Sequence, residues 1–267
     1  MFLSVIEAPP HWRNIDFISD LHLQASEPQT FDAWQAYMDK THADVVFILG
    51  DLFEVWVGDD AACDSSAGSF EIQCAAVLQR TAARIPVFFM RGNRDFLVGP
   101  AFMSQCQCAL LDDPTVLDFY GQRWLLSHGD ELCLADVDYL KFRAVVRSAP
   151  WQQNFLAKSL AERRAIARDL RQRSEAKKQS AKVYADVDND AALAWLREAG
   201  GTHMIHGHTH QPANHELEPG MRRIVLSDWD VAARPPRAEV LRLSIDGAAA
   251  AQTPHPASMS RIAPEDA

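Results

Sequence analysis

Residues 44–51, "DVVFILGD", decide the fold of this chain, because an uninterrupted apolar run there ends in a glycine and an aspartate. A β-branched run without polar alternation is typical of a strand that is buried on both faces. Such strands occur in parallel sheets that are covered on both sides. We therefore expect residues 44–50 to form a central strand, with Asp51 at its carboxyl end.

Strand and helix patterns alternate around this run. Further short apolar runs predict strands at 15–19, 87–90, 203–207, 223–227 and 239–245. Helical spacing predicts helices at 31–40 and about 70–83. Alternation of this kind favours an α/β layered domain, and the later strands predict a second sheet. Residues 135–200 show helical spacing between strands and predict a helical cap inserted into the domain.

Length and composition agree with one large domain that carries an insertion. The chain has 267 residues, of which 48% are hydrophobic and 23% charged. No stretch approaches the ~20 uninterrupted apolar residues of a membrane-spanning helix. We expect a single domain at 1–245, which includes the cap. The Ala/Pro/Ser-rich residues 246–267 predict a disordered tail.

The charge is distributed unevenly along the chain. The net charge is −10, which argues against non-specific nucleic-acid binding by the whole molecule. Residues 141–182, however, contain twelve Lys/Arg and three Asp/Glu, so this stretch is +9 and the remainder −19. Because three acids cannot pair twelve bases within the stretch, we interpret it as a surface for an anionic substrate and an anionic membrane. A solvated helix face is the alternative.

Metal-compatible side chains follow the predicted strands. In chain order they are Asp20, His22, Asp51, Asn93, His128, His208 and His210. The carboxyl ends of the strands are where α/β sheets form their sites. A single Asp-x-His is more often a turn, and a lone strand-end histidine is more often structural. The ordered joint pattern, with three histidines in "HGHTH" at 206–210, favours a metal centre.

Seven ligands exceed the capacity of one six-coordinate ion but suit two ions that share a carboxylate. We assign Asp51 as the bridge. One ion would be held by Asp20, His22, Asp51 and His210, and the other by Asp51, Asn93, His128 and His208. Mixed oxygen and imidazole ligands favour Mn²⁺, with Fe²⁺ as the second choice. Two such ions suit in-line displacement at phosphorus by a metal-held hydroxide.

Cysteines offer a weaker metal hypothesis. The chain has five cysteines, and Cys106-x-Cys108 has no second pair with which to complete a zinc site. We expect reduced thiols instead.

Several blocks resemble a known family. "FISDLHL" (17–23), "ILGDLFEVWVGDD" (48–60), "GNRDFLVG" (92–99), "SHGDELC" (127–133), "DYLKFR" (138–143) and "IHGHTHQPA" (205–213) carry the resemblance. They resemble the calcineurin-like metallophosphoesterases and, within them, the UDP-2,3-diacylglucosamine pyrophosphohydrolases of bacterial lipid A synthesis. The resemblance implies a four-layer αββα sandwich. It also implies Mn²⁺-dependent cleavage of UDP-2,3-diacylglucosamine to UMP and 2,3-diacylglucosamine 1-phosphate, peripherally at the cytoplasmic face of the inner membrane.

The resemblance also implies residues that contact the substrate. These are Asn93, Arg94, Asp136 and His208, and a Ser/Lys set that Ser174, Lys178 and Lys182 match only loosely. Leu134, Gln211 and Ser227 depart from the family pattern without affecting the predicted ligands. No motif indicates a protein partner.

Arg94 stands where many phosphate-cutting sites have a histidine that donates a proton. Its guanidinium remains protonated, so it cannot act as an acid. Cleavage of a pyrophosphate releases a phosphate, which leaves as an anion near pH 7. We therefore expect Arg94 to act with Asp51, Asn93 and His128 in catalysis, as a charge clamp on phosphate. A surface salt bridge with Asp95 is the alternative.

Three other functions remain open from the sequence. The first is a soluble nucleotide pyrophosphatase or phosphodiesterase of the same fold. The second is a scaffold that uses the metal site to bind a protein, and the third is a nuclease whose cap follows a nucleic-acid backbone. A soluble pyrophosphatase would also cleave UDP-sugars without acyl chains. A scaffold would show no Mn²⁺-dependent turnover, and a nuclease would cleave DNA in a salt-sensitive manner.

Overall fold

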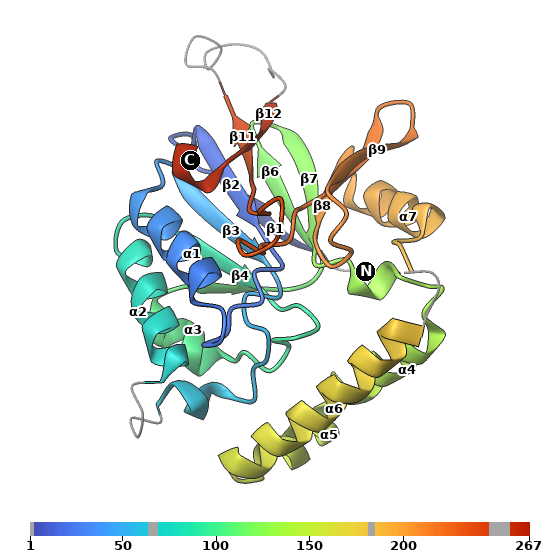
Figure 1. Cartoon of the computed structure of the whole chain (residues 1–267). Helices are drawn as coiled ribbons and strands as arrows, with labels where there is room; N and C mark the ends of the chain where they lie inside the picture. The colour runs from blue at the N-terminus through green and yellow to red at the C-terminus, as the bar shows by residue number, and fades with distance from the viewer. Residues whose placement is uncertain (1–2, 64–68, 181–184, 246–256) are drawn as a thin grey trace.

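The computed structural model describes residues 3–63, 69–180, 185–245 and 257–267, with the side chains of 173–180 left out. Two mixed six-stranded sheets face each other (Figure 1). The first sheet consists, in spatial order, of β12 (Ser258–Ile262), β11 (Val240–Ser244), β2 (Asn14–Ile18), β3 (Val45–Leu49), β4 (Val87–Met90) and β5 (Ala109–Leu111). The second consists of β1 (Ser4–Glu7), β6 (Thr115–Phe119), β7 (Gln122–Ser127), β8 (His203–His206), β10 (Met221–Val225) and β9 (Ala213–Glu218).

The run that opened the sequence analysis is β3, which lies inside the first sheet and pairs in parallel with β2 and β4. All five of its residues are buried. Val45, Phe47 and Leu49 point into the core between the two sheets, whereas Val46 and Ile48 point into the core beneath the helices. Alternate side chains of a strand face opposite sides, so both sets had to be apolar. This explains the unbroken apolar run.

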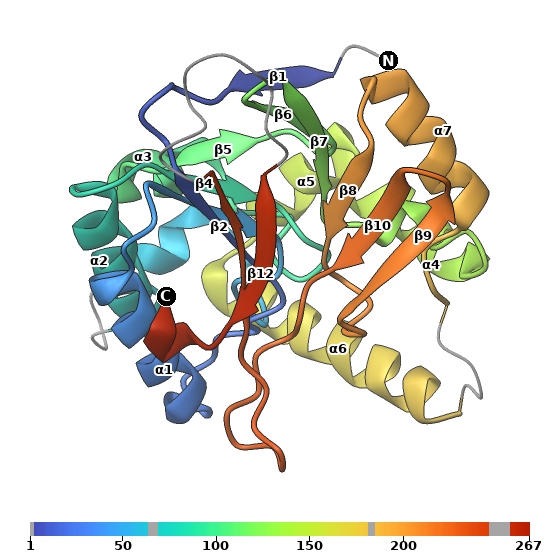
Figure 2. The same cartoon turned by 90° about the horizontal axis from the view of Figure 1, so that it is seen from above.

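Helices cover the outer face of each sheet, which completes the four-layer αββα fold. The first sheet packs on α1 (Pro28–Lys40), α2 (Phe70–Ala82) and α3 (Pro100–Cys106). The second sheet packs on α7 (Asn189–Ala199). In Figure 2, α7 lies on the opposite side of the paired sheets from α1 and α2. We had expected α7 to belong to the cap at 135–200, but buried Leu196 and Ala199 pack it against the second sheet instead.

The cap therefore consists of α4 (Val137–Val146), α5 (Ala149–Leu156) and α6 (Leu160–Ser180), which project beyond the sheets (Figure 1). No helix in the described ranges is both long and apolar enough to cross a membrane.

Arginines of the cap contact acidic side chains of the layered domain. The pairs are Arg143 with Asp130 and Glu131, Arg147 with Asp130, Arg163 with Asp60, Arg164 with Glu71, and Arg171 with Glu54. We had inferred that pairing could not account for the basic stretch, because only acids within it were counted. The partners lie far away in the sequence, so these five arginines contact the layered domain rather than form a free basic surface.

The C-terminal segment also differs from expectation. We predicted a disordered tail at 246–267, yet Ser258–Ile262 form β12, which pairs antiparallel with β11. Arg261 extends from β12 and donates hydrogen bonds to the carbonyls of Ala213 and Val225 in the other sheet. Residues 246–256 lie outside the described part of the chain.

Candidate metal centre

The predicted metal ligands lie in loops that leave the carboxyl ends of β2, β3, β4, β7 and β8. Their backbone is unusual. Seven non-glycine residues in the described ranges have positive φ, and five of them are predicted ligands, namely Asp20, His22, Asp51, His208 and His210. Residues other than glycine rarely adopt positive φ, and those that do are concentrated at functional sites. The strained backbone positions thus coincide with the predicted ligands.

One group of ligands comes from the loops after β2 and β8. The Nε2 atoms of His22 and His210 lie 3.1 Å apart, and Nε2 of His210 lies 3.3 Å from Oδ1 of Asp20. These three side chains have the spacing of a cation site. Asp20 is fully buried, and its oxygens accept hydrogen bonds from the backbone N–H of His208. The two loops are thereby tied together.

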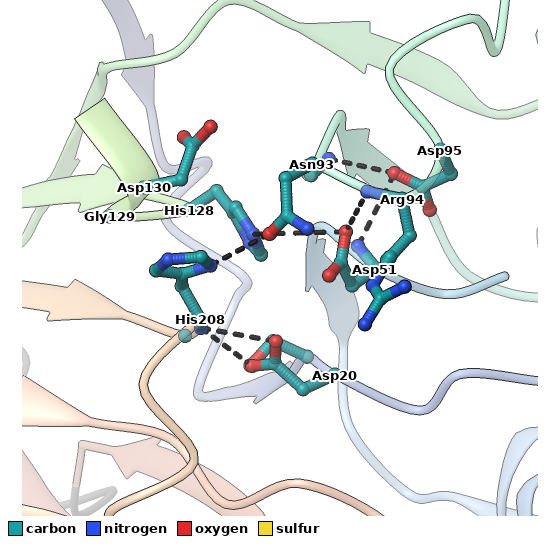
Figure 3. Close-up of polar contacts among 12 residues, drawn as sticks. Asp20, Asp51, Asn93, Arg94, Asp95, His128, Gly129, Asp130 and His208 are labelled. Carbon is teal, nitrogen blue, oxygen red and sulfur yellow. Dashed lines mark hydrogen bonds and ion pairs between the residues drawn. The ribbon is translucent and has the colours of Figure 1, made fainter. Parts of the chain in front are cut away.

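A second group surrounds Asn93. Its Oδ1 lies 3.0 Å from Nε2 of His128 and 2.7 Å from Nδ1 of His208 (Figure 3). Nδ1 of His128 lies 2.9 Å from the carbonyl oxygen of Leu49, an acceptor that selects the tautomer with the proton on Nδ1. In the neutral ring, Nε2 then carries the lone pair, on the side that faces Oδ1 of Asn93.

Asp51 lies between the two groups, where a bridging ligand is needed. Its Oδ1 lies 3.7 Å from Nε2 of His128, and Asp20, Asp51 and His128 also have the spacing of a cation site. The same oxygen accepts a hydrogen bond from the backbone N–H of Arg94 at 2.7 Å. Gly92 lies so close to Asp51 that a Cβ there would overlap the carboxylate. This explains the glycine in "RGNRD".

Asp95 binds the backbone of the loops that carry Gly92 and Leu52. Its side chain is fully buried, and its oxygens accept hydrogen bonds from the backbone N–H groups of Gly92 and Leu52 at 2.7 and 2.8 Å. Burial and the nearby charge of Asp51 raise the pKa of Asp95 to about 7. The alternative in which Arg94 forms a surface salt bridge with Asp95 is therefore wrong, because Asp95 is buried against backbone amides.

The electrostatics of the centre favour a cation. Burial disfavours the charged imidazolium of His128, but the carboxylates of Asp51, Asp20 and Asp130 outweigh burial and raise its pKa to about 9. Burial and the charge of His128 lower the pKa of His208 to about 3, which keeps that imidazole neutral. Metal binds neutral imidazole, so a cation held by His128 would take the place of the proton that the surrounding carboxylates favour. The donor set thus fits divalent cations with oxygen and nitrogen preferences.

Arg94 extends from the loop after β4 toward Glu54. Its NH1 lies 3.3 Å from Oε1 of Glu54, and about a fifth of the arginine side chain is exposed. Oε2 of Glu54 lies 2.9 Å from Nδ1 of His22, and Oε1 lies 3.0 Å from NH2 of Arg171 in the cap. Glu54 was missed in the sequence, where it is one polar residue inside "DLFEVW".

Asp130 is a second acid that the sequence analysis left without a role. It is fully buried beyond His128 and points away from Asn93 (Figure 3). Its Oδ2 accepts hydrogen bonds from the Tyr139 hydroxyl and from Nε of Arg143, both on α4. Arg147, which follows α4 directly, in turn donates to the carbonyl of Gly92 at 3.0 Å. The first cap helix is thus fixed to two loops of the metal centre.

Of the predicted substrate contacts in the cap, only Asp136 has a described side chain. Asp136 caps the N-terminus of α4, where its Oδ1 accepts from the backbone N–H of Tyr139. The side chains of Ser174 and Lys178 lie outside the described part of the chain, as does the whole of Lys182. The cation-compatible groups among the described residues contain no cysteine, and Cys106 is buried.

A cleft of about 620 Å³ adjoins the centre and is lined by Glu54 and Arg171. Its other walls come from the loop after β2 and from the starts of α1 and α2, with Phe31, Phe53 and Phe70 as apolar surface. The charged residues of the lining are three acids, Asp32, Glu54 and Glu71, against Arg171 alone, so the cleft offers apolar surface rather than a basic pocket.

Comparisons with known proteins agree with this geometry. Residues 13–212 match the family model of the calcineurin-like phosphoesterases. A UDP-2,3-diacylglucosamine hydrolase of Chromobacterium violaceum is 45% identical over 80% of this chain and 90% of its own length. One from Marinobacter nauticus is 44% identical over 80% of this chain and 88% of its own length. The chain therefore belongs to the calcineurin-like phosphoesterase family, together with these hydrolases.

Proposed function

We propose that the protein hydrolyses the pyrophosphate bond of UDP-2,3-diacylglucosamine to UMP and 2,3-diacylglucosamine 1-phosphate, in lipid A synthesis. The observation that carries the proposal is the convergence of seven metal-compatible side chains beside Arg94. The similarity to hydrolases of this name, at 45% identity, supports the substrate.

We assign Asp20, His22, Asp51 and His210 to one cation and Asp51, Asn93, His128 and His208 to the other. Lewis acidity toward a phosphate oxygen, and activation of water near neutral pH, are the chemistry that two divalent cations supply in such a site. The mixed oxygen and imidazole donors favour Mn²⁺.

The residues around the centre orient the phosphates. The backbone of Arg94 holds Asp51, while its guanidinium provides a permanent positive charge at the edge of the site. A charge placed there stabilises the phosphate that leaves, and no group is required to protonate it. Residue 94 has no side chain that can donate a proton to the leaving group, which fits cleavage of a pyrophosphate better than cleavage of an alkyl phosphate ester.

The direct test incubates the protein and Mn²⁺ with UDP-2,3-diacylglucosamine and measures UMP. We expect turnover that chelation abolishes and added Mn²⁺ restores. UDP-glucosamine without acyl chains serves as the matched control and should react poorly. Equal rates on both substrates would instead indicate a soluble nucleotide pyrophosphatase, and no Mn²⁺-dependent turnover on either would refute the proposal.

We further propose that the protein acts peripherally on the cytoplasmic face of the inner membrane. Four large apolar side chains are exposed at the start of the cap and along α4, namely Leu134, Val137, Phe142 and Val145. Lys141 lies among them and would favour anionic lipid headgroups. Vesicles with anionic lipid should sediment the protein, and a Val137→Glu/Val145→Glu variant should bind them more weakly. Equal binding by both proteins would refute this surface.

A further inference from the structure

We propose that Glu54 is a positioning residue, whose two carboxylate oxygens orient the metal ligand His22 and the phosphate clamp Arg94 at the same time. The idea rests on the proposed function, since it assigns a new role within that site. Glu54 follows β3 closely, and only about 6% of its surface is exposed. A buried carboxylate is costly unless cations or hydrogen-bond donors compensate it.

The first oxygen faces His22. Oε2 lies 2.9 Å from Nδ1 of His22, at hydrogen-bond distance although not in ideal alignment. A carboxylate next to Nδ1 favours the tautomer that carries its proton there. Nε2 of His22 then keeps its lone pair, and this is the atom that faces Nε2 of His210 across the centre. Glu54 thereby sets the direction in which His22 can bind a cation.

The second oxygen faces two arginines. Oε1 lies 3.3 Å from NH1 of Arg94 and 3.0 Å from NH2 of Arg171. Arg94 comes from the loop after β4, whereas Arg171 comes from the cap helix α6. One carboxylate therefore contacts a metal ligand, the clamp and the cap.

Replacement of Glu54 by glutamine separates these roles, because an amide has one acceptor oxygen and one donor group. If the oxygen remains toward the arginines, the NH₂ group faces His22 and favours the opposite tautomer. If the amide is reversed, the NH₂ group faces two guanidiniums. Either arrangement loses one of the two orientations, although the shape of the side chain is unchanged.

The experiment begins with the metal-free wild-type protein, labelled with ¹⁵N-histidine. We expect the His22 resonances, assigned by their loss in His22→Asn, to show the proton on Nδ1. A neutral His22 whose single proton lies on Nε2 would overturn the proposal without use of any Glu54 variant. This readout is independent of turnover, so it stands even if the proposed substrate is wrong.

Mn²⁺ affinity, measured by calorimetry, is the second readout. For Glu54→Gln we expect affinity or kcat to fall about 10- to 100-fold, as loss of a carboxylate behind a ligating histidine does. Mn²⁺ affinity should be unchanged in a variant that weakens a contact between cap and domain without touching Glu54 or His22. Asp60→Asn is the matched control, since it weakens a different contact between cap and domain, with Arg163. Wild-type Mn²⁺ affinity and kcat in Glu54→Gln would overturn the proposal.

Discussion

Arg94→Ala isolates the clamp from the rest of its loop. The backbone N–H of residue 94 holds Asp51, and alanine keeps that hydrogen bond. Glu54 retains Arg171 at 3.0 Å, so it does not become an unpaired buried charge. The change therefore removes little besides the guanidinium. Because Arg171 still pairs with Glu54, we expect the loss in the free energy of unfolding to stay below the roughly 3–5 kcal/mol that an uncompensated buried charge costs.

The effect on catalysis should be far larger. An oriented donor that stabilises charge in a transition state contributes about 2.7–4 kcal/mol, or a hundred- to thousandfold in kcat. Lysine keeps the charge but lacks the forked geometry, so Arg94→Lys should retain intermediate activity. Arg94→His should not rescue pyrophosphate cleavage, but it should increase activity on an alkyl phosphodiester, whose leaving group benefits from a proton.

The assay measures kcat on both substrates for the wild type and the three variants, with urea unfolding as a check on stability. A normal rate of pyrophosphate cleavage in Arg94→Ala would refute the clamp and leave Arg94 with a structural role only.

Three further predictions concern the bridge, the cap and the thiols. Asp51→Ala should abolish turnover because it disrupts both cation positions, and more than a few per cent of the wild-type rate with Mn²⁺ would contradict the two-metal assignment. Arg163→Ala removes a buried arginine that bonds to Asp60. Proteolysis within the cap should become faster, whereas hydrolysis of a small chromogenic phosphodiester should not change. An unchanged rate of proteolysis would argue that the Arg163–Asp60 pair does not hold the cap in place. Exposed Cys63 should react fastest with a thiol reagent, whereas burial raises the pKa of Cys133 to about 12 and should keep it unreactive until the protein unfolds.

The layered core could be predicted because its signals are local. An apolar run such as 45–49 is compatible with few environments, and the predicted strand at 87–90 coincides with β4. The helical spacing of 189–199 was equally visible, but periodicity does not reveal which surface a helix covers. For that reason α7 was assigned to the cap, although it packs on the second sheet.

The candidate metal ligands could be proposed from their order at strand ends, whereas the acids beside them could not. Glu54 and Asp130 owe their roles to partners such as Arg171 and Arg143, which lie more than ten residues away and are brought close only by the cap. A single sequence contains no local signal for such contacts. For the same reason, the acidic partners of the basic stretch 141–182 could not be identified from the sequence.

Strand β12 has a practical consequence for anyone who shortens this protein. The Ala/Pro/Ser-rich composition after residue 245 invites removal of the C-terminal residues, yet β12 forms the outer edge of the first sheet. Its loss would leave the backbone N–H and C=O groups of β11 unpaired, next to buried Val240, Leu241 and Leu243. Open edges of this kind template pairing with other chains and promote aggregation. β12 instead covers that apolar strand with an outermost strand that carries Ser258, Ser260 and Arg261.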